Sequence, residues 1–261
     1  MSGTPIRVKK DGGILEVTLD LPKANAIDWA TSRIMGDVFT EFRDDPTLGV
    51  AIITRAGAKF FCAGWDLKAG AERDTVDGDY GKGGFGRMQE LRGLNKPVIA
   101  AINGICCGGG LELALSADII LAADNATFAL PEIHSGNLAD AACIKLPRRI
   151  PYYVAMEMLF TGRWMDAAEA KHWGLFNHIY PMAELVDKTR KMAELLAAGR
   201  PLVYAAIKEA VRETEDMKFL DAMNRVIKSQ LESVEVLYGS EDQREGARAF
   251  AERRNPVWKG R

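Results

Sequence analysis

The chain has 261 residues, with 34 Lys and Arg against 36 Asp and Glu, and a formal net charge of −2. At about 100–200 residues per domain, this length allows one large domain, or one domain with a modest appendage. With 48% hydrophobic and 27% charged residues, the chain has the composition of a soluble globular protein and not of a disordered one. The near-neutral charge argues against nucleic acid as the main partner, because nucleic-acid-binding proteins usually carry a basic face.

The cysteines and the apolar segments exclude other classes of protein. The four cysteines lack the paired CxxC spacing of a zinc site or a disulfide framework, so we expect thiols in a reducing cytoplasm and no metal. No charged segment precedes an apolar run at the start, so no signal peptide is expected. The most membrane-like window, 98–121, includes Glu112 and Asp118, and a charge at mid-bilayer is costly, so we expect no membrane span.

In chain order, the first 200 residues alternate strand and helix patterns. Apolar and polar residues alternate on both sides of Asp11-Gly12-Gly13, which predicts a hairpin over 6–20. The spacing of Ile34, Val38 and Phe42 predicts a helix over 28–42. Short apolar runs predict strands at 50–54, 98–102, 119–122 and 127–129, and helical patterns cover 86–92, 110–117, 154–161, 166–172 and 182–198. This alternation favours the α/β class.

From residue 201 onward the pattern becomes helical. Residues 201–214, 218–237 and 241–253 predict helices, without a convincing strand. We therefore expect a core at 1–200 and a helical region at 201–261. Residues 70–86 are polar and rich in glycine, which predicts a mobile surface loop.

Three segments carry the residue types of a reaction site. FFCAGWDL (60–67) places a small Ala-Gly pair where a backbone N–H could meet a ligand, and GICCGGGLELAL (104–115) opens a helix with three glycines. A helix start presents unpaired N–H groups and the positive end of its dipole, although a glycine triplet can equally serve tight packing. Glu112 interrupts an apolar helix, and an ionised buried glutamate needs a partner or a catalytic role. In FALPE (128–132), Glu132 follows a strand and a proline.

Together with LPKANAID (21–28), KPVIAAINGICCGGGLELALSADI (96–119), ATFALPEI (126–133) and GARAFAERRNPVWKG (246–260), these segments resemble the enoyl-CoA hydratase/isomerase (crotonase) superfamily, in the family's order and over nearly the whole chain. The resemblance implies a spiral of ββα turns with C-terminal helices that pack between subunits of a homotrimer or a dimer of trimers. It implies an acyl-CoA thioester as substrate and no cofactor apart from the CoA of that substrate.

The same resemblance implies a mechanism by position. The thioester oxygen would lie between the N–H groups of Ala63 and Gly109, which would stabilise an enolate-like state. Glu112 and Glu132 match the two family carboxylates that handle water and the Cα proton. Retention of both favours hydration or dehydration. Double-bond isomerisation and a non-catalytic CoA-binding role remain as alternatives.

The resemblance also implies a substrate-binding set, comprising Ala24, Ala26, Gly64, Trp65, Asp66, Leu67, Asp140 and Lys259. Within the superfamily, this chain is most similar to the members that act on carnitinyl-CoA and crotonobetainyl-CoA, whose acyl chains carry a trimethylammonium group. Trp65 or Asp140 would then receive that group, although Trp65 could instead pack on adenine or pantetheine. Residues 133–143 depart from the family's glycine-containing pattern, so the resemblance does not determine which acyl chain the substrate carries.

Overall fold

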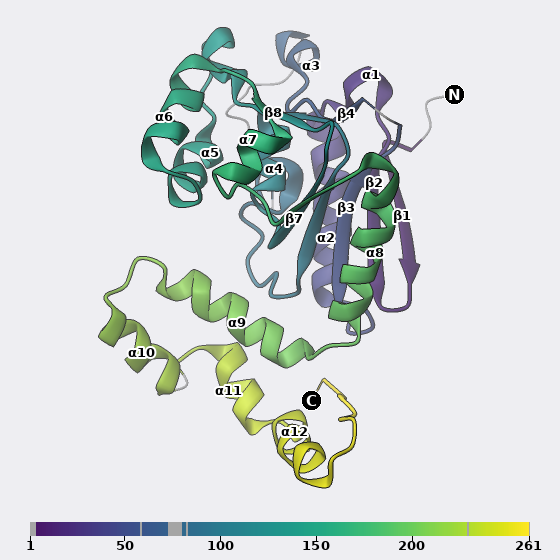
Figure 1. The fold of residues 1–261 in the computed structure, drawn as a ribbon, viewed down its shortest axis with the longest axis vertical. Helices are drawn as coiled ribbons and strands as arrows, with labels where there is room; N and C mark the ends of the chain where they lie inside the picture. Colours follow the sequence, from purple (N-terminus) through teal and green to yellow (C-terminus); the bar gives the residue numbers. More distant parts are fainter. Residues whose placement is uncertain (1–3, 58, 73–79, 82, 229, 261) are drawn as a thin grey trace.

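The computed structural model describes residues 4–57, 59–72, 80–81, 83–228 and 230–260 (Figure 1). Its larger sheet has six strands in the order β1-β2-β3-β5-β7-β10. These strands are β1 Ile6–Asp11, β2 Ile14–Leu19, β3 Val50–Arg55, β5 Val98–Ile102, β7 Ile119–Ala123 and β10 His178–Tyr180. Only β1 and β2 pair antiparallel, as the predicted hairpin, and all other neighbours are parallel.

A smaller sheet, in the order β4-β6-β8-β9, lies beside the first. It consists of β4 Phe60–Cys62, β6 Ile105–Cys107, β8 Thr127–Ala129 and β9 Met165–Asp166. Strands β4, β6 and β8 are parallel, so their carboxyl ends meet at one edge. Each of the three follows one strand of the larger sheet and precedes a helical segment, which is the ββα repeat that the resemblance implied.

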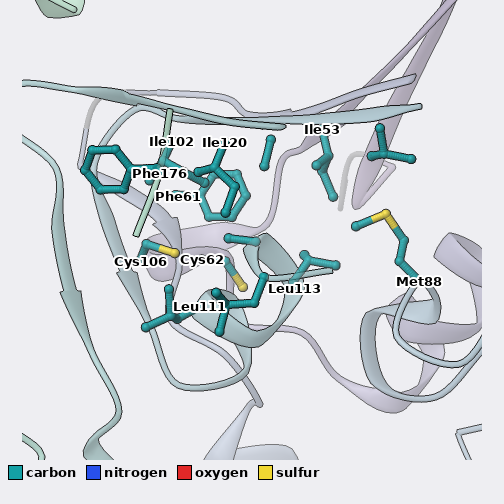
Figure 2. Close-up of a cluster of buried hydrophobic side chains, with 14 of the residues drawn as sticks. Ile53, Phe61, Cys62, Met88, Ile102, Cys106, Leu111, Leu113, Ile120 and Phe176 are labelled. Atoms are coloured by element: carbon teal, nitrogen blue, oxygen red, sulfur yellow. The ribbon is translucent and has the colours of Figure 1, made fainter. Parts of the chain in front are cut away.

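The core lies between the two sheets and continues behind the larger one. On β3, Ala51 and Ile53 face the smaller sheet, whereas Val50 and Ile52 face the opposite side. Figure 2 shows Ile53 together with Phe61 of β4 and Leu111, which belong to the same cluster of buried side chains. Because both faces of the larger sheet are covered at β3, β5 and β7, these central strands are continuous apolar runs, whereas β1 at the edge is mostly exposed.

Helices complete this core. They are α1 Pro22–Asn25, α2 Trp29–Asp44, α3 Leu67–Glu72, α4 Gly109–Ala114, α5 Asp140–Lys145, α6 Tyr152–Thr161, α7 Ala167–His172 and α8 Met182–Ala197, with the 3-10 helices η1 Phe85–Arg87, η2 Pro131–Ser135 and η3 Leu146–Arg148. The carboxylate of Asp28 accepts a hydrogen bond from the Thr31 N–H, which caps α2 at the predicted start. Helix α8 buries Leu185 and Ala193 against the outer face of the larger sheet (Figure 1).

The described residues after 200 form helices without a strand, as predicted. These are α9 Pro201–Thr214, α10 Phe219–Ile227, α11 Glu232–Gly239 and α12 Glu241–Glu252, which extend away from the sheets in Figure 1. Ala206, Leu231 and Val234 form a small core of their own. Lys208 joins α9 to the main body through an ion pair with Asp118, at 2.7 Å between Nζ and Oδ2.

Several predictions of local structure were wrong. The predicted helix over 86–92 is only the short η1 followed by turns, and the predicted helix over 218–237 is divided into α10 and α11. Strands β4, β6, β9 and β10 were missed, because two or three residues are too few to establish a period. Of the predicted loop over 70–86, residues 73–79 and 82 lie outside the described part, and residues 70–72 belong to α3. In the described part of the chain, no helix is both long enough and apolar enough to cross a bilayer.

Candidate active site

A cavity of about 1080 Å³ opens at the edge where β4, β6 and β8 end. Ala63 follows β4, Gly108 and Gly109 follow β6, and Glu132 follows β8 at the start of η2. All four residues line the cavity. The carboxyl ends of parallel strands are the usual place for ligands in α/β proteins, because the connecting loops converge there. The fold therefore brings the three sequence segments to one place.

Gly109 opens helix α4 at the wall of this cavity. Its N–H lies in the first turn, where the helix itself supplies no acceptor. The backbone of Gly64 lies directly against it, since a Cβ atom on Gly64 would lie 2.6 Å from the Gly109 nitrogen. Gly64 has φ +89°, a conformation that glycine adopts without strain. These features leave the helix start open toward the cavity.

Ala63 differs from the sequence expectation of a free N–H donor. Its N–H donates to the carbonyl oxygen of Ala24, at 3.1 Å, so the donor is already paired. To bind a thioester oxygen, Ala63 would have to exchange this hydrogen bond. Residues 60–62 and 22–25 are held together by Asn25, whose Nδ2 donates to the Phe60 carbonyl oxygen at 3.0 Å.

Glu112 lies on α4, one turn after Gly109, and its side chain lines the cavity. The Ala142 N–H of α5 donates to its Oε1 at 2.9 Å. Burial raises the pKa of Glu112 to about 7, and the nearby carboxylates of Asp140 and Glu132 add to the rise. A carboxyl group with this pKa is partly ionised at neutral pH and can exchange protons in both directions.

Glu132 is the second cavity carboxyl group. Burial raises its pKa, and the charge of Asp140 acts in the same direction. In the described structure its Oε2 is buried without a hydrogen-bond partner. A Cβ atom on Gly108 would lie 2.9 Å from its Oε1, so a side chain at Gly108 would require the Glu132 carboxyl group to move. An unpaired buried oxygen is costly, and a water or substrate group would satisfy it.

Trp65, Leu67 and Asp140 also line the cavity. The buried Trp65 Nε1 has no hydrogen-bond partner among the described residues. Asp140 begins α5, so the segment predicted as an altered loop ends in a helix. His134 lines the same cavity.

Other residues of the predicted substrate-binding set do not line the cavity. Ala24 and Ala26 lie beside β4, where the Ala24 carbonyl accepts the Ala63 N–H. The Asp66 carboxylate accepts from the Lys68 N–H at 2.9 Å, and this contact caps α3. Lys259 lies after α12, and its Nζ pairs with Glu241 Oε2 at 3.0 Å.

Sequence reasoning missed several cavity residues. They are Tyr80, Phe85, Gln89, Glu90, Leu138, Ile144 and Lys145. Their signal was weak, because residues 86–92 were predicted as a helix and residues 133–143 as a loop. The unexplained buried charge of Glu112 was the one pointer to a nearby cation such as Lys145.

The cysteines have the environment of packing residues. Cys62 and Cys106 are fully buried, and burial raises the pKa of Cys62 to about 12. Burial also raises the pKa of Cys107 to about 11. Thiols of this kind are protonated at neutral pH and are poor nucleophiles. Among the described residues, no group of three or more His, Cys, Asp or Glu side chains is arranged to hold a metal ion.

Comparison with known proteins shows the family of this chain. The model of the family "Enoyl-CoA hydratase/isomerase" matches residues 9–261. The chain belongs to this family, as the sequence resemblance implied. It is 51% identical to carnitinyl-CoA dehydratase of Proteus mirabilis (strain HI4320), over 96% of each chain, and 51% identical to carnitinyl-CoA dehydratase of Escherichia coli (strain K12), over 98% of each.

Solved structures confirm the crotonase fold. The crystal structure of enoyl-CoA hydratase from Mycobacterium tuberculosis H37Rv superimposes with a TM-score of 0.89 at 37% identity, over 98% of this chain and 99% of that one. Enoyl-CoA hydratase from Bacillus anthracis gives a TM-score of 0.88 at 31% identity, over 99% of this chain and 100% of that one. The protein is therefore an enzyme of the hydratase/isomerase family.

Proposed function

We propose that this enzyme reversibly hydrates an enoyl-CoA thioester, and that its substrate pair is crotonobetainyl-CoA and carnitinyl-CoA. The observation that carries the hydratase assignment is that Glu112 and Glu132 face the same cavity as the start of α4. Addition of water across a double bond requires one group to take a proton from water and another to deliver a proton to Cα. Two carboxyl groups with raised pKa values suit these two tasks.

In the proposed reaction, the thioester oxygen accepts a hydrogen bond from the Gly109 N–H. It also replaces the Ala24 carbonyl oxygen as the acceptor of the Ala63 N–H. Ionised Glu112 accepts a proton from water while the water oxygen bonds to Cβ. The electrons of the double bond move onto the thioester oxygen, where the two N–H groups stabilise the enolate. Protonated Glu132 then delivers its proton to Cα, which restores the thioester carbonyl. Dehydration follows the reverse path, and the only cofactor-derived group needed is the CoA of the substrate.

The lining of the cavity supports a cationic acyl chain. Its acidic side chains are Glu90, Glu112, Glu132 and Asp140, and its aromatic side chains are Trp65, Tyr80 and Phe85. Among the described lining residues, Lys145 is the only lysine or arginine. A trimethylammonium group cannot donate a hydrogen bond, so aromatic faces and diffuse negative charge must recognise it. The names of the 51% identical relatives favour the same substrate pair.

The test compares kcat/KM for crotonobetainyl-CoA and uncharged crotonyl-CoA in the wild type and in Asp140→Asn. We expect the wild type to prefer the charged ester, and the substitution to reduce that preference. If the wild type prefers crotonyl-CoA, or if the ratio does not change, the carnitine assignment fails and the hydratase assignment remains. Formation of a shifted double bond without a hydroxyl product would instead support isomerisation, and binding without turnover would support a non-catalytic role.

The proposal includes a homotrimer or a dimer of trimers in the cytoplasm. Helix α10 buries none of its residues, and it exposes 75% of Phe219, 72% of Leu220 and 69% of Ile227. Such an apolar helix face is usually covered by another chain. The unpaired cysteines suit a reducing compartment. Light scattering of the purified protein measures the assembly mass, and a monomeric mass would contradict this part of the proposal.

A further inference from the structure

Helix α5 makes two contacts, one with helix α4 and one with the turn that follows α4. The Ala142 N–H of α5 donates to Glu112 Oε1 at 2.9 Å. Three residues later, Lys145 Nζ donates to Ser116 Oγ at 2.7 Å. Ser116 follows Glu112 by four residues, and its hydroxyl donates to the Glu112 carbonyl oxygen at 2.8 Å. The proposed base is therefore held at its carboxylate and at its backbone.

Lys145 has a second hydrogen-bond partner. Its Nζ donates to Gln89 Oε1 at 3.3 Å, so it joins α5 to the segment after η1 as well as to the turn after α4. Lys145, Gln89 and Glu112 all line the cavity. Half-burying a lysine here is costly, and burial lowers its pKa to about 8. Its retained hydrogen bonds and the negative charge of Glu112 offset part of that cost.

From this geometry we propose that Lys145 is a positioning residue for Glu112. By fixing α5 on α4, it keeps the Ala142 N–H on one carboxylate oxygen and leaves the other oxygen directed to water. Its charge also favours the ionised form of Glu112, which is the form that accepts a proton from water. This inference rests on the proposed hydratase function, and it adds a residue that the assignment of Glu112 and Glu132 does not require.

Other charges act on the same pair. Asp140 and Glu132 face Glu112 and disfavour its ionised form, and Cys143 of α5 is a further titratable neighbour. Lys145 is also influenced by Glu90, Asp140 and Arg149. Lys145 is the cation that acts on Glu112 and opposes the neighbouring carboxylates. Its removal should therefore raise the pKa of Glu112.

The test uses Lys145→Met, which keeps the length of the side chain and removes its charge. We expect kcat to fall at least about 10-fold, toward the order of 10²-fold that a misplacement of about 1 Å costs. The Kd for saturated γ-butyrobetainyl-CoA, which cannot be hydrated, should stay within about 2-fold. The acidic limb of the kcat profile should move to higher pH, because the carboxylate has lost a nearby cation. Lys145→Arg should recover most of kcat.

Ser116→Ala tests the same contact from the turn after α4 and keeps the charge of Lys145. We expect it to lower kcat, and we expect the double variant with Lys145→Met to be little worse than the worse single variant. Lys191→Met on α8 is the matched control, because its side chain is 68% exposed and forms an ion pair with Asp187 on the same helix. Circular dichroism checks the folding of each variant.

Direct titration separates this inference from the proposed function. The carboxyl carbon of Glu112 can be followed by 13C NMR and assigned with Glu112→Gln. A higher Glu112 pKa in Lys145→Met supports the inference even if the wild type hydrates no ester offered. An unchanged pKa with unchanged kcat would overturn it, and so would a raised Kd with unchanged kcat, which would make Lys145 a substrate ligand. Additive losses from Ser116→Ala and Lys145→Met would also overturn it.

Discussion

Gly64 and Gly109 meet backbone to backbone at the entrance to helix α4. A Cβ atom on Gly64 would lie 2.6 Å from the Gly109 nitrogen and 3.1 Å from the Cys107 carbonyl oxygen. Backbone atoms cannot move aside as the end of a long side chain can. The position of the proposed oxyanion donor therefore depends on a residue without a side chain in the neighbouring segment.

Gly64→Ala should displace the Gly109 N–H and reduce kcat by roughly 10²-fold or more, the scale for losing one oxyanion donor. It should also lower the melting temperature. Gly174→Ala is the control, because Gly174 has φ +79° but nothing within 4 Å of an added Cβ. That variant has a similar conformational cost, about 1–2 kcal/mol, and should keep its activity. Equal activity losses in the two variants would show that catalysis does not depend on the Gly64–Gly109 contact.

Glu132→Gln should lower turnover by about 10²–10⁴-fold, the range for a general acid–base group. Binding of a saturated CoA ester should be nearly unchanged, because the amide has almost the same shape as the carboxyl group. Stopped-flow turnover and calorimetric binding measure the two effects. Glu184→Gln, on the exposed side of α8, is the control. Near-wild-type turnover would remove Glu132 from the mechanism.

Glu112→Gln should make the protein more stable at pH 8 and change its stability little at pH 5. The folded pKa of Glu112, about 7, lies above its ordinary value of 4.5. The folded state therefore binds more protons than the unfolded state in this interval, and the wild type loses stability as the pH rises through it. The shift corresponds to about 3 kcal/mol at most, at about 1.4 kcal/mol per pH unit.

Urea unfolding at fixed protein concentration, at pH 5 and pH 8, measures this difference. The glutamine can still accept the Ala142 N–H, so the comparison isolates the charge. The same variant should lose most hydration activity. It should retain exchange of the Cα proton with solvent, if Glu132 serves Cα. A stability difference that is the same at both pH values would contradict the raised pKa.

Gly70→Ala should reduce the preference for a cationic acyl chain. Gly70 lies in α3, and its Cβ would lie 1.8 Å from Cη2 of Trp65, so the indole ring would have to move. A cation–π contact of about 0.5–2 kcal/mol corresponds to a ratio of about 2–30. The kcat/KM ratio of crotonobetainyl-CoA to crotonyl-CoA should therefore decrease by a factor within that range. Gly239→Ala in α11, with nothing within 4 Å, is the control and should leave the ratio unchanged.

The central strands β3, β5 and β7 of the larger sheet could be predicted from the sequence, because burial on both faces makes them continuous apolar runs. Strand β3 was predicted within one residue of its observed end. Helix α4 was also expected, since its glycines and its apolar residues mark both the start and the buried face. The family resemblance identified Gly109, Glu112 and Glu132, and the structure brings these residues to one cavity.

The remaining features depend on contacts between distant segments. The division between α10 and α11 arises where Leu231 turns inward to pack with Ala206, and a local helical pattern contains no sign of that contact. The pairing of the Ala63 N–H with the Ala24 carbonyl joins residues far apart in the chain. Lys145 was missed for the same reason, because its role depends on where α5 docks on α4.

The smaller sheet delivers each site component by a separate strand. The ends of β4 and β6 supply the two proposed thioester-oxygen donors, and the end of β8 leads to Glu132 and then to Asp140. Insertions or substitutions after Glu132 can therefore reshape the acyl pocket while the donors stay in register. A family built in this way can diversify its acyl chains one connection at a time, with the thioester chemistry inherited intact.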